Sequence, residues 1–303
     1  MSTADRPSLG IALMLGFCVL APMGDALAKY LGDRIPLGQL LLVRFGVQAA
    51  LLIPLVWFAA RSFKMSRRVL RLTALRTALH IVGIGAMFTA LRYMPLADTV
   101  AIAFVMPFIM LLLGKYVLGE EVGARRLIAC IVGFAGTLLV IQPSFAAVGA
   151  PALLPLLVAV VFALFMLVTR QVAKDVDPIS MQAVSGVMAC AMLGLLYPVF
   201  GPLAPQALSF VVPQGIDVGL LFLIGALGTL AHLLMTWSLR FAPSATLAPM
   251  QYLEIPVATI IGFLAFRDWP NGMAQLGIAI TIASGLYIIF RERRQAQAVP
   301  PAA

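Results

Sequence analysis

One acidic residue stands in the middle of a long apolar stretch near the end of the chain. Glu254 lies within residues 243–268, PSATLAPMQYLEIPVATIIGFLAFRD, with Gln251 and Pro256 close by. A carboxylate at the centre of a bilayer is costly unless it is paired, protonated or facing a water-filled cavity. A carboxyl group held away from water also takes up a proton more readily. We therefore predict that Glu254 and Gln251 line a polar cavity; the alternative is that Glu254 accepts hydrogen bonds that brace a kinked helix.

The other ionisable candidates also lie inside apolar stretches. His80 and His232 are the chain's two histidines, and each either lines the cavity or makes a satisfied polar contact within the protein. Asp25 and Lys29 are four residues apart, which is the spacing of a charge pair on one helix face, unless Asp25 faces a pathway. Arg44 lies too deep in its apolar stretch to be free of cost unless it pairs or reaches the surface.

Aromatic side chains are candidates for the apolar wall of the same cavity. Phe88, Phe104 and Trp237 are the predicted wall residues, although such residues more often pack against other helices or face lipid. Neither an H-E-x-x-H pattern nor a Cys/His cluster occurs, so no metal site is predicted. The sequence also lacks a Gly-rich nucleotide loop, and no Ser/His/Asp or paired-acid motif accompanies Glu254. We accordingly predict no cofactor and no catalytic residue.

These candidate residues must be positioned by helices that cross a membrane. Of the 303 residues, 62% are hydrophobic and only 11% are charged, and the mean hydropathy is +1.03. A soluble domain carries about a quarter charged residues, so this chain has too little polar surface to coat itself in water. The net charge of +9 sits in short loops, which indicates membrane topology and no nucleic-acid partner. The predicted spans are residues 8–31, 36–59, 74–93, 95–118, 124–142, 151–171, 178–200, 216–239, 243–266 and 272–290.

The chain repeats itself in two halves. A second interrupted stretch, residues 95–121, is preceded by the same Leu-Arg-aromatic-x-Pro order that precedes residues 243–268. Pro107 and Pro256 stand near the middle of the two stretches, and Pro22 lies in the first span. Because proline removes a backbone donor, each predicts a helix kink or a gating hinge. Interrupted helices at matching positions of two halves indicate a transporter binding site.

Positive charge predicts how the two halves enter the membrane. If both termini are cytoplasmic, the inner loops hold most of the lysines and arginines, including those of Arg61–Arg76. The second interrupted stretch then runs opposite to the first, as in an inverted repeat. The predicted fold is an all-α integral membrane protein with ten transmembrane helices in two inverted five-helix repeats. The repeats are residues 1–145 and 146–292, and residues 293–303 are predicted to be a disordered cytoplasmic tail.

Short motifs recur in the same order through both halves. They are Leu91, Pro95-Leu96-Ala97, Pro107, Gly119-Glu120-Glu121, Gly133 and Gly136, then Pro243-Ser244-Ala245, Tyr252-Leu253-Glu254-Ile255-Pro256, Asp268, Gly277 and Gly285. In this order they resemble the ten-helix members of the drug/metabolite transporter superfamily, which are built from two EamA-type domains. Lys29 and Arg44 fall where members of that family often have a lysine and an arginine. The resemblance implies export or exchange of small metabolites, often amino acids, through a cavity between the halves. It also implies that the fifth and tenth helices are peripheral.

The leading hypothesis is a secondary transporter that exports amino acids or related small metabolites across a bacterial inner membrane by alternating access. The alternative is a lipid-carrier or drug flippase of the same fold. An intramembrane enzyme is least favoured, because acid, base and nucleophile would have to converge at one depth. The expected partners are a small-molecule substrate and membrane lipids, and a monomer is expected.

Overall fold

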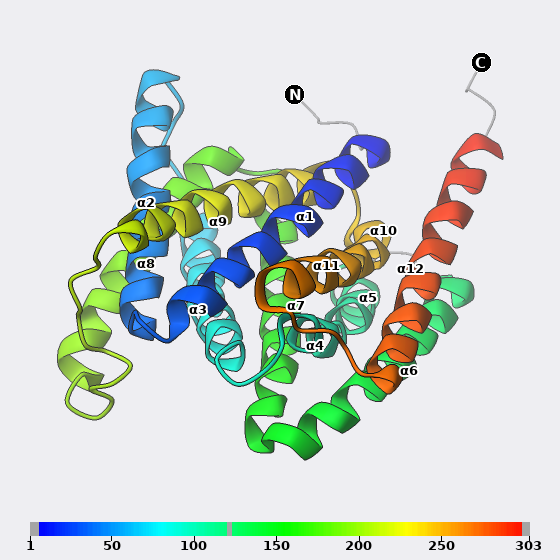
Figure 1. Cartoon of the computed structure of the whole chain (residues 1–303). Coiled ribbons are helices and arrows are strands. Elements are labelled where there is room, and N and C mark those ends of the chain that lie inside the picture. Colours follow the sequence, from blue (N-terminus) through cyan, green and yellow to red (C-terminus); the bar gives the residue numbers. More distant parts are fainter. Residues whose placement is uncertain (1–5, 120–122, 299–303) are drawn as a thin grey trace.

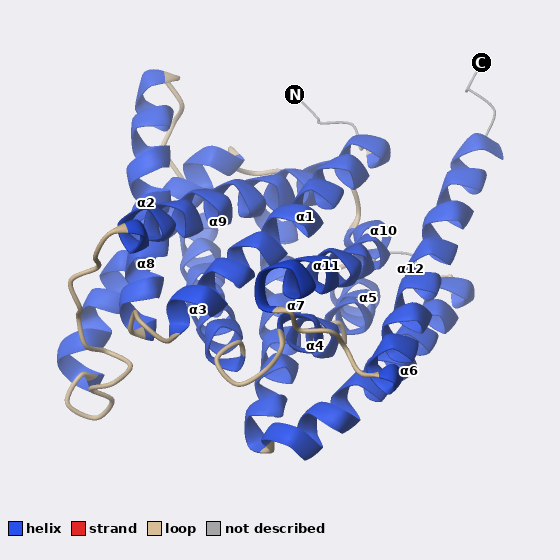
Figure 2. Cartoon of the chain, in the orientation of Figure 1, coloured by secondary structure: helices blue, strands red, loops and turns tan. Residues whose placement is uncertain are grey.

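The structure is a computed structural model that describes residues 6–119 and 123–298. Helices form nearly all of these residues, and no strand occurs among them (Figure 2). The all-α fold class predicted from the sequence is therefore confirmed. Glu120 and Glu121, which carry part of the family resemblance, lie outside the described residues.

The helices follow the order expected from the apolar stretches. The first half contains α1 (Pro7–Gly32), α2 (Leu37–Phe58), α3 (Arg67–Ala90), α4 (Leu96–Ala103), α5 (Met106–Val117) and α6 (Ala124–Val148). The second half contains η1 (Ala150–Leu153), α7 (Leu154–Val172), α8 (Pro178–Phe200), α9 (Ile216–Phe241), α10 (Ser244–Leu247), η2 (Ala248–Leu253), α11 (Glu254–Phe266) and α12 (Gly272–Ala298). Within the described residues, 8 segments are long and apolar enough to cross a membrane, and two shorter apolar helices cover Met250–Phe266 and Gly272–Tyr287. These segments coincide with the ten predicted spans.

The third helix begins earlier than the sequence predicts. The apolar pattern places its start at residue 74, but α3 starts at Arg67. The side chain of Ser66 caps it by accepting a hydrogen bond from the backbone N–H of Val69 at 3.2 Å. The basic segment is thus largely helical, and Arg76 lies more than two turns inside a helix.

The last helix also continues beyond its predicted end at residue 290. α12 extends to Ala298, into the segment predicted to be a disordered tail. The added residues, RERRQAQA, include several strong helix formers, which favour propagation of the helix beyond the membrane span. Residues 299–303 lie outside the described part of the chain.

Both interrupted helices are broken near their prolines. α4 ends at Ala103, two residues form a turn, and α5 begins at Met106 with Pro107 in its first turn. Because Pro107 has no N–H, the carbonyl group of Ala103 loses its helical partner there. In the second half, α10 and the tighter helix η2 precede α11, and Pro256 stands in the first turn of α11. Glu254 is consequently the first residue of a half-helix.

The contacts between the two halves come in equivalent pairs: where a helix of the first half packs on a helix of the second, their counterparts in the opposite halves pack on each other as well. The helices at positions one to five are α1, α2, α3, α4–α5 and α6 in the first half, and α7, α8, α9, α10–α11 and α12 in the second. α1 packs on α9 and α3 packs on α7, and each pair joins position one to position three. α2 packs on α8 and α6 packs on α12, which are equivalent positions. This two-fold pattern fits the inverted repeat.

α6 and α12 pack side by side along one edge of the molecule, apart from the helices that surround the centre (Figure 1). The bulk of the bundle is formed by α1, α2, α3, α7, α8 and α9, with the broken helices next to it. The centre of the molecule is therefore enclosed by helices from both halves.

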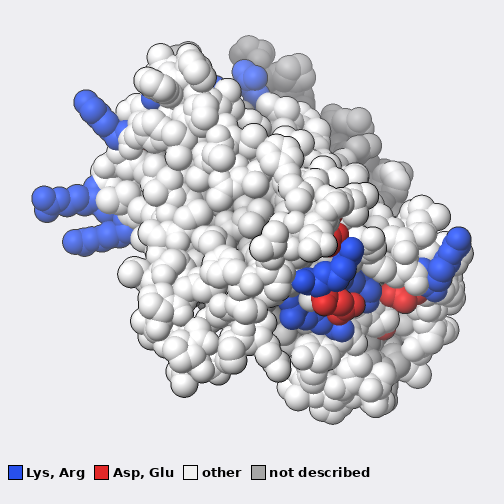
Figure 3. Space-filling view, turned by 60° about the vertical axis from the view of Figure 1, so that its left-hand side comes forward, with Lys and Arg blue, Asp and Glu red and all other residues white. Residues whose placement is uncertain are grey.

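Apolar side chains cover much of the outer surface. Figure 3 shows a wide face without charged side chains, between a group of basic residues at one side and a mixed patch at the other. Large exposed apolar residues include Phe58, Leu195 and Leu264, which are 84%, 71% and 67% exposed. Soluble monomers rarely expose such patches, so these side chains face the acyl chains of a bilayer.

Candidate functional site

A cavity lies between the two halves of the protein. Its described lining comes from α1, α2, α3, α4 and the start of α5 in the first half, and from α7, α9 and α11 in the second. Neither α6 nor α12 contributes a described residue to this lining. Most of the wall is apolar, but four ionisable side chains face the cavity: Asp25, Arg44, His232 and Glu254. Small-molecule sites typically have this character, an apolar wall with a few polar groups.

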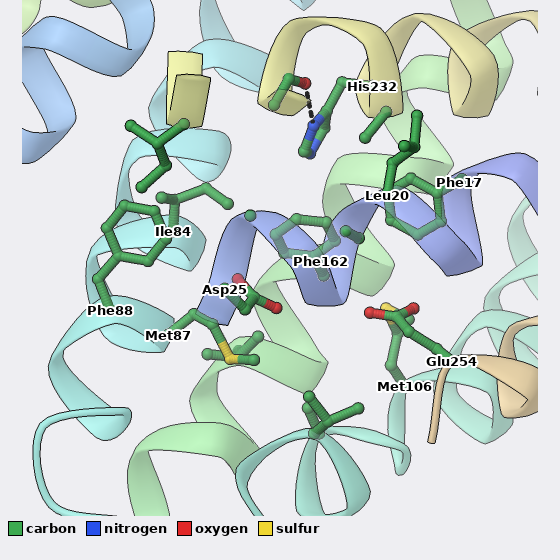
Figure 4. Close-up of a pocket in the computed structure, with 18 of the residues that line it drawn as sticks. Phe17, Leu20, Asp25, Ile84, Met87, Phe88, Met106, Phe162, His232 and Glu254 are labelled. Carbon is green, nitrogen blue, oxygen red and sulfur yellow. Dashed lines mark hydrogen bonds between the residues drawn. The ribbon is translucent and has the colours of Figure 1, made fainter. Parts of the chain in front are cut away.

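Two carboxylates, one from each half, face the cavity. Figure 4 shows the oxygen atoms of Asp25, on α1, and of Glu254, at the start of α11, pointing toward each other. Glu254 is only 8% exposed. Neither carboxylate accepts a hydrogen bond from a described residue. No described donor therefore supports the alternative in which Glu254 braces the helix, and both acids are available to a ligand or to protons.

Arg44 and the two histidines form a basic cluster in the same site. Arg44 is 3% exposed, and its Nη2 lies 3.4 Å from Nε2 of His80 and 3.1 Å from Nδ1 of His232. The two imidazole rings are 4.2 Å apart between centroids and tilted by 39°. The structure thus brings together His80, from α3, and His232, from α9, beside one guanidinium group. Figure 4 shows His232 at a distance from the two carboxylates, so the cavity separates a basic region from an acidic one.

Gly228 makes room for the arginine. A Cβ atom at this position would stand 2.9 Å from Nε and 3.0 Å from Cζ of Arg44. Only glycine lets the guanidinium group lie directly against α9 without a shift. The carbonyl oxygen of Gly228 also lies 2.9 Å from Nδ1 of His232, as the dashed line in Figure 4 marks.

Three polar atoms of the basic cluster have no partner among the described residues: Nη1 of Arg44, Nε2 of His232 and Nδ1 of His80. If Nδ1 of His232 carries the hydrogen, it donates to Gly228 and leaves Nε2 as a free acceptor. If Nδ1 instead accepts from Arg44, Nε2 carries the hydrogen and is a free donor. In either tautomer Nε2 finds no partner among the described residues, and neither does Nη1 of Arg44. A bound molecule or water can satisfy both atoms.

Phenylalanine rings form the apolar part of the wall. Phe88 and Phe104, both predicted from the sequence, line the cavity and are each 2% exposed. Phe17 and Phe162 line it as well, and the ring of Phe162 lies 6.0 Å from that of His232. The cavity can therefore hold an aliphatic or planar group between its charged regions.

A second arginine lies one helical turn from His80. Arg76 is fully buried and donates to hydroxyl oxygens of Thr169 at 2.8 Å and Ser185 at 2.9 Å, and to the amide oxygen of Gln182 at 3.2 Å. These acceptors are neutral and belong to α7 and α8 of the second half. One side chain of α3 consequently joins the two halves next to the cavity.

From its composition, the basic segment of residues 61–76 is predicted to lie partly at the membrane interface, but the structure buries Arg76 inside α3 and against the other half. The composition of residues 61–76 hides the helix start, since most of its basic residues are exposed and only Arg76 is fully buried. The burial of Arg76 could have been predicted from the spacing of polar residues along the helix. Arg76 lies four residues before His80, as Arg44 lies four residues before Gln48, so each pair shares a helix face.

Three predicted cavity residues lie outside the described lining. Gln251 is fully buried, with its Nε2 atom 3.1 Å from the sulfur atom of Met166. Trp237 packs against a separate apolar cluster that includes Val56 and Leu233. His80 is also not among the lining residues, but it contacts His232 and Arg44, which are.

The expected Asp25–Lys29 pair is replaced by other contacts. Lys29 donates to the carbonyl oxygen of Met94 at 2.6 Å and lies 3.5 Å from the carboxylate of Asp268. Its long side chain reaches the end of α1, whereas Asp25 faces the cavity.

The three prolines differ in their surroundings. α1 continues as one helix through Pro22, whereas Pro107 and Pro256 each stand in the first turn after a break. The side chain of Pro107 lies outside the described part of the structure. Gating at these positions stays a prediction.

The comparison with known proteins agrees with this architecture. The model of the EamA-like transporter family matches residues 8–142 and 150–291. The chain is 25% identical to the S-adenosylmethionine uptake transporter of Rickettsia prowazekii, over 94% of each chain. It is 30% identical to the riboflavin transporter of Rhizobium johnstonii, over 73% of this chain and 70% of that one. A crystal structure with 18% identity superposes with a TM-score of 0.69, covering 95% of this chain and 98% of the other, and supports the fold alone.

Proposed function

We propose that this chain, which belongs to the EamA-like transporter family, moves a small zwitterionic metabolite across a bacterial inner membrane by alternating access. The observation that carries the proposal is the cavity between the halves, which has carboxylates in one region and an arginine with a histidine in another. The phenylalanine rings supply an apolar wall for the rest of the molecule. A multi-pass transporter needs such a site at the interface of its repeats.

Contacts between the halves at both ends of the bundle fit an alternating mechanism. At the end where α1 finishes, Lys29 of the first half meets Asp268 of the second. At the opposite end, Arg61 pairs with Asp177, and Arg68 pairs with Asp175 at 3.0 Å. Rocking one half against the other breaks the contacts at one end and keeps those at the other. Exposed ion pairs are weak, so they can open without a large free-energy cost.

The substrate class follows from the charges. An α-amino acid has an ammonium group and a carboxylate, which match Asp25 and Glu254 on one side and Arg44 on the other. S-adenosylmethionine, named for one relative, carries the same group together with a sulfonium and a planar base. We therefore propose amino acids or a metabolite that contains an amino-acid group as the substrate. The proposed direction is export, which the resemblance to the drug/metabolite transporters implies and the cavity charges do not decide. Riboflavin, named for another relative, has no carboxylate and is the comparison substrate.

The test is transport by the purified protein in liposomes. Radiolabelled amino acids, S-adenosylmethionine and riboflavin are offered to vesicles loaded with the same unlabelled compound, with and without a pH gradient. We expect exchange of at least one compound with an amino-acid group and little exchange of riboflavin, relative to protein-free liposomes. Exchange of riboflavin alone, or movement of labelled lipid without any metabolite exchange, would overturn the proposal. Vesicles of known protein orientation then show whether the favoured direction is export.

A further inference from the structure

The basic cluster has unused binding capacity that faces the cavity. Arg44 is only 3% exposed, and its Nη2 atom lies within hydrogen-bond distance of two imidazole rings. Its Nη1 atom and Nε2 of His232 have no partner among the described residues. Buried polar atoms are usually hydrogen-bonded, so two of them together at one cavity wall point to a ligand.

The protein's own acids do not neutralise this arginine by direct contact. Asp25 and Glu254 face the same cavity, yet neither forms an ion pair with Arg44 within the described residues. A buried cation without a contact ion pair is costly, and a bound anion reduces that cost. Asp25 acts on Arg44 by a longer-range Coulombic attraction, and a bound carboxylate adds the contact partner that this arginine lacks.

The surroundings restrict the size and shape of the anion. Gly228 allows the guanidinium group of Arg44 to lie flat against α9. The ring of Phe45 also packs on this group, with its centroid 4.9 Å from Cζ of Arg44. Arginine binds planar carboxylates through two parallel hydrogen bonds when both terminal nitrogens are free. Here Nη2 is already shared with the histidines, so one oxygen is expected at Nη1. The other is expected at Nε2 of His232 in the tautomer that carries the hydrogen there and accepts from Arg44 at Nδ1.

We infer that Arg44 and His232 bind the carboxylate of the substrate, while the carboxylates of Asp25 and Glu254 receive its positive group. The inference rests on the proposed function and makes it more specific, because it sets the orientation of an amino-acid group in the cavity. The charge-assisted contacts select a carboxylate-containing substrate over the corresponding amine. The arginine is a specificity-determining residue under this assignment.

The test compares ligands that differ only in the carboxylate. The probes are S-adenosylmethionine and its decarboxylated form, and L-phenylalanine and phenethylamine. Binding is measured on the detergent-purified full chain by the rise in thermal midpoint over a range of ligand concentrations. We expect the wild-type protein to bind at least one carboxylate-containing probe about 10- to 100-fold more tightly than its carboxylate-free partner.

The variant Arg44→Gln is expected to bind the two members of that pair with similar affinity, and Arg44→Lys to keep part of the preference. Arg125→Gln, at an exposed residue outside the cavity, serves as the matched control and keeps the wild-type ratio. Equal affinity for both members in the wild-type protein, a preserved ratio in Arg44→Gln, or no binding of any probe would overturn the inference.

The result can be separated from the proposed function. A carboxylate preference that depends on Arg44, in a protein that moves none of the probes across liposomes, supports the subsite and contradicts transport. Transport of an amino-acid compound with an unchanged ratio in Arg44→Gln supports the proposed function and removes the subsite.

Discussion

Single residues decide the chemistry of this cavity, and Glu254 is the clearest case. The sequence left open whether its carboxyl group faces a cavity or braces a kinked helix. In the structure it lines the cavity, at the N-terminus of the half-helix α11, and accepts no hydrogen bond from a described residue. Its backbone N–H donates to the carbonyl oxygen of Gln251, because η2 runs directly into α11. The cavity position of the carboxylate is therefore not explained by a free helix end.

Glu254→Gln keeps the size and most of the polarity of the side chain but removes its titration. We expect transport to fall about tenfold or more, or to lose its dependence on pH, with a thermal midpoint near that of the wild type. Transport by the liposome assay between acidic and alkaline pH checks this. Asp33→Asn, which alters an exposed acid just after α1, is the control. Unchanged transport by the Gln variant at every pH would remove the coupling role.

Gly228 offers a test of the arginine's position that leaves every polar group in place. In Gly228→Ala the added Cβ would lie 2.9 Å from Nε of Arg44, so the guanidinium group must move. We expect transport to fall about tenfold. Gly219→Ala is the control on the same helix, because no atom lies within 4 Å of its added Cβ. Alanine is the better helix former, so this control should keep activity and gain up to about 1 kcal/mol of stability. Equal transport by both variants would contradict the role given to Gly228.

At the scale of elements, Arg76 connects α3 to helices of the other half. Its neutral acceptors on α7 and α8 satisfy the hydrogen bonds of the guanidinium group without an acid from any described partner. Charge-assisted hydrogen bonds between buried groups are costly to break, so this contact holds α3 against the second half in the state that the structure shows.

Arg76→Met removes these hydrogen bonds and is expected to favour a state in which the inner end of α3 is open. Thr73 is fully buried one turn earlier on α3 and supplies the reporter position, as Thr73→Cys in a chain without Cys18, Cys130 and Cys190. Thiol labelling at this position should be several-fold faster in the Arg76→Met background. Arg71→Met, at an exposed residue of the same helix, is the control. Equal labelling rates in both backgrounds would show that the contact does not hold α3 closed.

At the scale of the whole molecule, the pairing of helices across the halves is the same for either orientation in the membrane. The charges of the loops therefore set the orientation. The basic residues of the Arg61–Arg76 segment and the short inner loops predict that both termini are cytoplasmic. Reporter domains fused after residue 303 and inserted at residue 63 should both be active on the cytoplasmic side, and one inserted at residue 34 on the opposite side. A segment around residue 63 that faces outward would reverse the entire topology.

The sequence by itself determined the fold class and much of the inventory of the site. Composition alone requires a bilayer, because so few charged residues cannot coat the surface in water. Glu254 and the prolines predicted the broken helices. A carboxylate, or a backbone position without an N–H, is costly inside an apolar stretch in any fold. The aromatic candidates Phe88 and Phe104 were also predicted to line the cavity, and both do.

Only the tertiary structure decided which of these residues meet. Whether a polar side chain faces a cavity, another helix or the end of the bundle depends on the rotation and register of helices far apart in sequence. Lys29 therefore lies beside Asp268 and not Asp25, and Arg76 lies at the junction of the halves and not at the interface. The joining of Arg44 to His80 and His232 spans three helices from both halves, and it depends on the missing side chain of Gly228. Local spacing shows which residues share a helix face, but it does not show which distant helix that face meets, because the free energy that selects such contacts comes from packing between the helices.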